Sequence, residues 1–250
     1  MAVSSLLGEF SGGGHGAGQF VTSAFTPPSG SLLVVIVYAQ EQSGSNVDVG
    51  TQITVSGGGH AYTPQVTVND VDSWTSGLKI YTAPVTTGAS MQLTIDCGAY
   101  TIYTYRVVVL AVTAYDTGTP TGATASAATG VTNGAETLTL SGAPALDSVV
   151  IAALATESVG SANSVLHGTG WTELYDVGAG SDFGSLQVQT RTASTSTGVG
   201  WDDVSTDAGG LWQNIRAALE IRAGAGPAVD TGKIFNRTVR PRPFAPGNAR

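Results

Sequence analysis

The sequence predicts an all-β protein: a jelly-roll-like β-sandwich that is internally duplicated and ends in an extended C-terminal arm. Three observations lead to this fold class. Apolar residues alternate with polar ones or form short continuous runs, Gly- and Asn-rich turn signals separate these segments, and similar segments recur about 110 residues apart. A period of two is typical of strands. Many short strands between turns are typical of sandwiches and jelly rolls.

The expected strands are of two kinds. Continuous apolar runs, which predict central strands covered on both faces, occupy residues 32–38, 107–113 and 149–154. Alternating segments, which predict one apolar and one polar face, occupy residues 91–96, 137–140, 186–189 and 216–222. The Gly-rich stretch 11–18 is expected to be a flexible loop before a β-type Phe20-Val21-Thr22, and no helix of ordinary length is expected.

Three pairs of similar segments predict the duplication. Ala39 and Ala155 end similar apolar runs 116 residues apart, Leu78 and Leu186 begin similar segments 108 residues apart, and Arg106 and Arg216 begin similar strands 110 residues apart. We therefore expect a first β repeat over 1–118, a second over 119–224 and a basic arm over 225–250. Two tandem domains remain an alternative. The uncharged segment 117–135 favours one compact body, because a solvated linker normally carries charge.

Composition and charge limit the function classes. Only 11% of residues are charged against 42% apolar, which excludes a disordered chain. The net charge is −8, yet five of the ten cations lie in the last 18 residues, where there is no acid. The acidic body argues against nucleic-acid binding, which needs a clustered basic face. No secretion signal and no apolar run of membrane-spanning length are present, so no membrane association is expected.

No pattern in the chain predicts an enzyme, a cofactor or a metal. The histidines His15, His60 and His167 lack metal-ligand spacing, and the lone Cys97 is expected to be a small buried residue. Acids at 69–72 and 202–207 do not follow a calcium-loop pattern and are interpreted as turn residues. No serine lies in a nucleophile-elbow context. A hydrolase is the least favoured hypothesis.

The tryptophans and the C-terminal segment supply the candidate binding residues. Packing is the favoured role of the four tryptophans, with Trp171 pointing inward, while Trp74 and Trp201 are candidates for stacking on a glycan. The C-terminal segment combines arginines, spaced aromatics and prolines, which favour an extended path. Such a segment is expected to order along another chain. Its candidate assembly residues are Phe235, Arg237, Arg240, Arg242, Phe244 and Arg250.

Several segments resemble a group of tailed-bacteriophage structural proteins known as minor tail proteins. They are Gly-Trp-Thr-Glu-Leu (170–174), Leu-Gln-Val-Gln-Thr-Arg (186–191), Ala-Val-Thr-Ala-Tyr-Asp-Thr-Gly-Thr-Pro (111–120) and the closing Arg-Pro-Phe-Ala-Pro-Gly-Asn-Ala-Arg (242–250). The resemblance covers most of residues 30–224. The first repeat departs from it at His60-Ala61-Tyr62, where a Trp-Thr pair is expected. The resemblance implies a β-sandwich virion component on a tail tip or head surface.

The resulting hypothesis is a non-enzymatic virion structural protein, either a minor tail protein or a capsid decoration protein, held on the particle by its C-terminal arm. Its expected partners are other virion proteins, namely capsid or tail subunits. A homo-oligomer and a host surface glycan are open as further partners. The alternative function is a host-receptor or carbohydrate-binding module.

Overall fold

The computed structural model describes residues 2–15, 19–41, 48–70, 76–130, 134–158, 163–177, 184–192, 194–206 and 211–224. The first half contains β1 (Val3–His15), β2 (Gln19–Val21), β3 (Leu32–Glu41), α1 (Val49–Gln52), β4 (Thr54–Ser56), β5 (Thr63–Asn69), β6 (Ser76–Pro84), β7 (Thr94–Asp96) and β8 (Ile102–Thr113). The second half contains β9 (Thr121–Gly130), β10 (Gly134–Thr139), β11 (Val149–Ser158), β12 (Asn163–His167), β13 (Thr172–Val177), β14 (Ser185–Thr192), β15 (Gly198–Thr206) and β16 (Leu211–Ile221).

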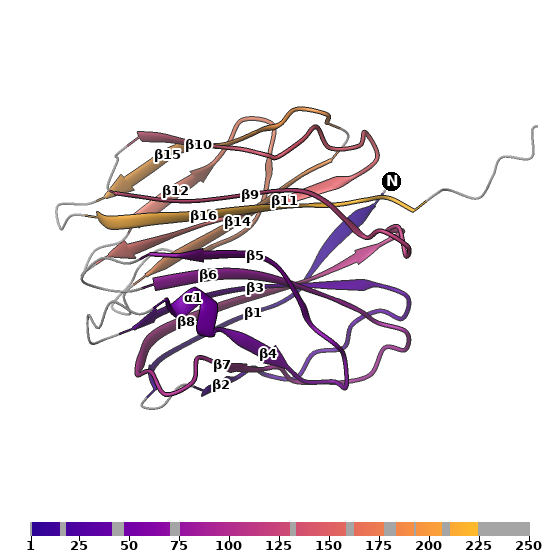
Figure 1. Ribbon diagram of the computed structural model, residues 1–250, viewed down its shortest axis with the longest axis horizontal. Coiled ribbons are helices and arrows are strands. Elements are labelled where there is room, and N and C mark those ends of the chain that lie inside the picture. The colour runs from indigo at the N-terminus through magenta and orange to yellow at the C-terminus, as the bar shows by residue number, and fades with distance from the viewer. Residues whose placement is uncertain are drawn as a thin grey trace, which may run out of the picture.

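The strands form four sheets, which Figure 1 shows stacked as layers. The two inner sheets have five strands each, in the orders β1-β8-β3-β6-β5 and β13-β14-β11-β16-β9. The two outer sheets have three strands each, in the orders β2-β7-β4 and β10-β15-β12. All pairings between these strands are antiparallel. The predicted all-β sandwich is confirmed.

Three apolar clusters hold these layers together. The central cluster joins the two inner sheets, because residues such as Ile36 of β3 and Leu110 of β8 lie in one cluster with Ile151 of β11 and Leu219 of β16. A second cluster packs β7 and α1 on the first inner sheet, and a third packs β10 and β15 on the second. Strands β3, β8 and β11 are therefore covered on both faces, as their continuous apolar runs predicted.

The second half repeats the strand order of the first. Raising every strand number in β1-β8-β3-β6-β5 by eight gives β9-β16-β11-β14-β13, and the same step converts β2-β7-β4 into β10-β15-β12. With Leu78 and Leu186 as equivalent positions, the pairing makes Tyr38 equivalent to Ala155 and Val108 equivalent to Ala217. Two of the spacings inferred from sequence, 116 and 110, are therefore one residue away from the structural spacings of 117 and 109.

Strands β1 and β9 occupy small-residue segments that the sequence does not predict as strands. The Gly-rich stretch up to His15 belongs to β1, which pairs with β8 along its length, so the prediction of a flexible loop is wrong there. Residues 121–130 form β9, the edge strand beside β16. Small residues dominate both segments, and cross-strand hydrogen bonds rather than periodic apolar side chains define these strands.

The polar faces predicted for β14 and β16 also differ from those observed. Gln187, Gln189, Arg216 and Glu220 are buried, although they alternate with apolar residues. The outer sheet covers this face of the inner sheet, so the polar side chains point into a protein layer rather than into solvent. Each one must therefore find hydrogen-bond partners inside the molecule.

Candidate functional site at the end of β16

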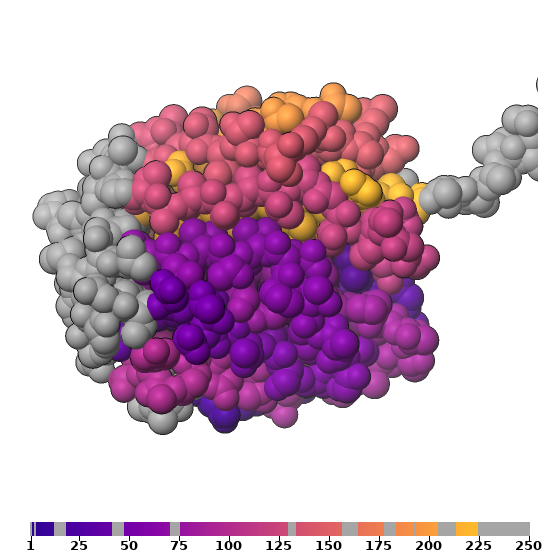
Figure 2. Space-filling view, viewed as in Figure 1, coloured from indigo at the N-terminus to yellow at the C-terminus, as the bar shows by residue number. Residues whose placement is uncertain are grey.

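Strand β16 ends at Ile221, and the chain continues to Gly224, the last residue described before the C-terminal segment. Three backbone hydrogen bonds fix this continuation to the connection between the halves. Asp116 N donates to Arg222 O at 2.8 Å, Arg222 N donates to Pro120 O at 2.9 Å, and Gly224 N donates to Ala114 O at 2.9 Å. Figure 2 shows β16 and its continuation, in yellow, along the line where the two halves meet.

The backbone here is tightly constrained. Ala114 has a φ of 54°, and it is the only non-glycine with positive φ among the described residues. A Cβ added at Gly224 would lie 2.7 Å from Tyr115 O, so only glycine fits at this approach. Left-handed backbone at a residue with a side chain costs about 1–2 kcal/mol, and the surrounding hydrogen bonds must offset that cost.

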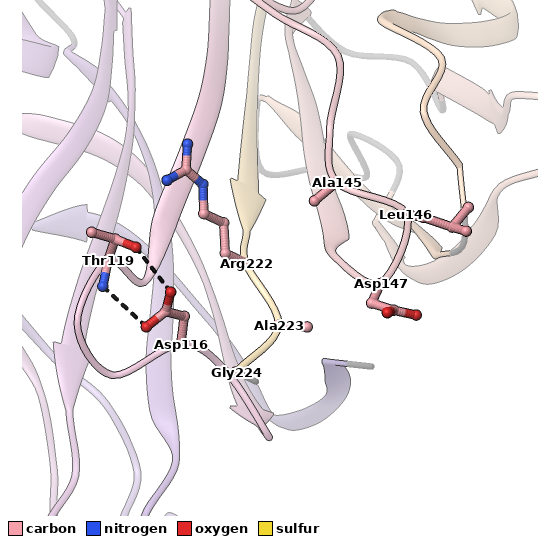
Figure 3. Close-up of a pocket in the computed structure, with 8 residues that line it drawn as sticks. All are labelled: Asp116, Thr119, Ala145, Leu146, Asp147, Arg222, Ala223 and Gly224. Carbon is pink, nitrogen blue, oxygen red and sulfur yellow. Dashed lines mark hydrogen bonds between the residues drawn. The ribbon is translucent and has the colours of Figure 1, made fainter. Parts of the chain in front are cut away.

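A hollow of about 360 Å³ lies beside this junction (Figure 3). Polar and charged groups share its wall with small apolar ones. Asp116 and Thr119 come from the connection between the halves, where Asp116 accepts hydrogen bonds from Thr119 N and Thr119 Oγ1. The remaining lining residues are Ala145, Leu146, Asp147, Arg222, Ala223 and Gly224.

Arg222 separates this hollow from a second one of about 260 Å³, which Glu220 and Ser141 also line. Hydrogen bonds from Gly118 N and from the Thr119 hydroxyl and N–H, together with the nearby Arg222, hold the pKa of Asp116 below its usual range. Arg222 also contributes to the lowered pKa of Glu220, beside the hydrogen bonds that this carboxylate accepts. One exposed cation therefore lies between two ionised carboxylates.

Glu220 fixes the wall between the two hollows. Its carboxylate accepts hydrogen bonds from Ala123 N at 2.8 Å, Ala145 N at 2.8 Å and Ser148 Oγ at 2.7 Å. Desolvation raises the pKa of Glu220, but these three donors and Arg222 lower it by more, so the net pKa lies below the ordinary value. A buried carboxylate thereby holds β9 and the 145–148 segment against β16.

The other side of the hollow is exposed and acidic. Leu146 is 60% exposed at the rim, although it is a large apolar residue. The backbone carbonyl of Asp147 accepts a hydrogen bond from Ala2 N at 3.0 Å. The N-terminal segment and the end of β16 therefore meet at the same loop. The lining holds two carboxylates, Asp116 and Asp147, and one cation, Arg222, so the hollow carries an excess of negative charge.

The predicted assembly residues lie outside the described part of the chain, as does Trp74. They are Phe235, Arg237, Arg240, Arg242, Phe244 and Arg250. Trp201 is described and is 1% exposed, with its indole N–H donating to Gln187 Oε1 at 2.7 Å. A ring buried between two sheets cannot stack on a sugar, so the structure does not support a glycan-binding role for Trp201.

Trp171 and Cys97 lie in apolar clusters, and His167 lies at the surface. Trp171 packs inward in the third apolar cluster under Arg191, whose guanidinium lies 4.4 Å from the ring centroid, and Cys97 is fully buried, as expected for both. His167 makes a partly exposed contact of 3.5 Å with Glu173. Within the described ranges, no group of three or more His, Cys, Asp or Glu side chains is arranged to hold a metal ion.

Sequence reasoning did not find the hollow. Asp116, Asp147 and Arg222 are far apart in the chain, and each sits in an unremarkable turn or strand end. The Asp-Thr-Gly-Thr-Pro turn at 116–120 signals a reversal of the chain. It does not signal which later residues will lie beside that reversal, because this depends on the pairing of β16 with β9.

The chain matches no family model, no curated protein and no solved structure. Among the described residues, no helix is long and apolar enough to cross a membrane.

Proposed function

We propose that the chain is a non-enzymatic virion structural protein of a tailed phage, a minor tail protein or a capsid decoration protein, held on the particle by residues 225–250. The phage assignment rests on the sequence resemblance. The repeated strand order supports a duplicated jelly-roll scaffold, since each half divides eight antiparallel strands between two sheets.

The observation that carries the anchoring role is the way in which the arm is attached. Residues 225–250 follow directly on β16, which lies between β11 and β9 in an inner sheet. Ile215, Ala217, Leu219 and Ile221 of this strand are buried in the central cluster. The hydrogen bonds at Arg222 and Gly224 extend the attachment to the edge of the body. A load on the arm therefore passes into a strand whose apolar face is buried in the central cluster.

Deletion of residues 226–250 tests this function. The expected product folds as the full chain does, because the deletion begins beyond the last described contacts, but it fails to join particles in an infected or reconstituted system. Unfolding of the purified product in urea checks that the body is intact. Normal incorporation of a folded truncation would exclude the arm as the anchor.

Two sets of point variants separate the contribution of the charged residues of the arm from that of its aromatic residues. Replacing Arg237, Arg240 and Arg242 with Gln removes their charge-assisted hydrogen bonds to partner carboxylates. Replacing Phe235 and Phe244 with Ala removes the apolar anchors. Both sets are expected to lower incorporation, and substitution of Thr231 and Asn248 with Ala is the matched control that should leave it unchanged.

A further inference from the structure

We propose that the hollow lined by Asp116, Leu146, Asp147 and Arg222 is the docking site for the basic segment 233–250 of a second copy of this chain. This inference rests on the proposed function, because it names one partner of the arm. The hollow of each copy lies next to the start of its own arm, and in this proposal it binds the arm of another copy.

Charge complementarity identifies the occupant. Residues 233–250 contain five cations and no acid, whereas the hollow presents Asp116 and Asp147 against one lining cation, Arg222. Arg222 lies near both Asp116 and Glu220, whose pKa values are lowered mainly by hydrogen bonds and in addition by this cation. Arg222 is thus already compensated, and Asp147 remains as a carboxylate for an incoming guanidinium. Arginine binds a carboxylate with two parallel hydrogen bonds, which fixes its position.

The apolar part of the hollow fits the same occupant. Leu146 is 60% exposed, and Ala145 and Ala223 extend the apolar surface beside it. In the sequence Arg240-Pro-Arg-Pro-Phe244, cations lie within four residues of an aromatic ring. A ring packed on Leu146 and a guanidinium on Asp147 would bury apolar area and pair charge at once.

The direction of the chain favours docking between copies over docking within one copy. The hydrogen bonds of Arg222 and Gly224 hold residues 222–224, which follow β16, against the connection between the halves, and Gly224 lines the hollow. Gly226 precedes Pro227, and a residue before proline is disfavoured in the helical conformation that an immediate reversal would need. Both features favour an arm that reaches a neighbour over one that reverses at once onto its own body.

The resulting contact is heterologous, because the arm of one copy meets the hollow of another. A pair of copies therefore still has one unoccupied arm and one unoccupied hollow. Such a contact can close into a ring or continue as a row, according to the rotation between copies.

Sedimentation velocity of the full-length chain tests the proposal. The wild-type protein is expected to self-associate as its concentration rises. Asp147→Lys and the double variant Arg240→Glu/Arg242→Glu should each weaken this association about tenfold or more, because each places like charges together. Asp48→Lys makes the same charge change at an exposed residue whose side chain forms no capping hydrogen bond, and should leave association unchanged.

Mixing the two interface variants distinguishes docking between copies from docking within one copy. The arm of the Asp147→Lys chain is intact and so is the hollow of the arginine variant, so the mixture should form one-to-one pairs that neither variant forms alone. Absence of such pairs, or a wild-type chain that stays monomeric throughout, would overturn the proposal. Association that needs the arginines but not Asp147 would overturn it too, while leaving the anchoring function of the arm intact.

Discussion

Lys79 and Gln187 occupy equivalent positions in the two halves, and each links an inner sheet to the layer outside it. Lys79 Nζ donates to Ile53 O at 2.9 Å and Thr51 O at 3.3 Å, at the end of α1. Gln187 Oε1 accepts from Trp201 Nε1 of β15. The same site on β6 and β14 thus performs the same structural task with different chemistry, an ammonium in one half and an amide in the other.

The Gln187–Trp201 hydrogen bond predicts a specific loss of stability. Trp201→Phe leaves Gln187 Oε1 buried without its donor and removes part of a fully buried side chain. Because both effects are unfavourable in a packed layer, the free energy of unfolding should fall by about 2–4 kcal/mol. Urea denaturation measures it. In a double-mutant cycle with Gln187→Leu, the two losses should sum to more than the loss in the double variant; simple additivity would show that the hydrogen bond contributes nothing.

The buried ion pair between Glu136 of β10 and Arg216 of β16 predicts an asymmetric response. Arg216 is 4% exposed, and it also donates to Thr137 O and Thr129 Oγ1. Glu136→Ala leaves this guanidinium buried without its counter-ion, which should cost about 3–5 kcal/mol in thermal or urea unfolding. The double variant Glu136→Met/Arg216→Met removes both charges and should lose less than Glu136→Ala alone. A larger loss in the double variant would contradict the prediction.

Glu220 predicts how stability depends on pH in the acid range. Its pKa in the folded protein lies below the value in the unfolded chain, which is about 4.3. The unfolded state therefore binds protons first as the pH falls, so the stabilisation present above about pH 4.3 is lost as the pH drops through the folded pKa. Glu220→Gln should flatten the acid slope of the unfolding free energy. An unchanged slope would show that other carboxylates control it.

The positive φ of Ala114 predicts a stabilising substitution. Ala114→Gly removes the steric cost of the left-handed conformation, about 1–2 kcal/mol, and adds backbone entropy to the unfolded chain worth about 0.5–1 kcal/mol. A net gain of up to about 1 kcal/mol in unfolding free energy is expected. Ala111→Gly in the middle of β8 is the matched control and should destabilise the protein.

The sequence predicts the all-β fold class, but it does not predict to which side of its sheet each side chain points. Leu78 and Leu186, which the sequence matches between the halves, both lie in the central cluster. Arg106 and Arg216 were paired on their shared residue type, yet they point to opposite sides of their sheets. Arg106 donates to Gly184 O between the two halves, and Arg216 contacts Glu136 in an outer sheet. A one-residue error reverses the face of a strand, and strands covered on both faces give no polar alternation to reveal it.

The candidate site was less predictable than the fold, for a related reason. The arm remains a prediction from the composition of one continuous segment, residues 225–250. The hollow at its root is built from Asp116, Asp147 and Arg222, which only the pairing of β16 with β9 and the three donors to Glu220 bring together. Local sequence describes turns and charge, but not which distant turns share a surface.

The hydrogen bond from Ala2 N to Asp147 O has a practical consequence for labelling the protein. Since Asp147 and Gly224 line the same hollow, Ala2 and Gly224, the first and last described residues, lie at one pole of the body, and a fluorescent domain joined directly at either of them would emerge there. The opposite pole, where β3 ends at Glu41, would face away from that attachment. Insertions for display belong at that far pole, where neither terminus is disturbed.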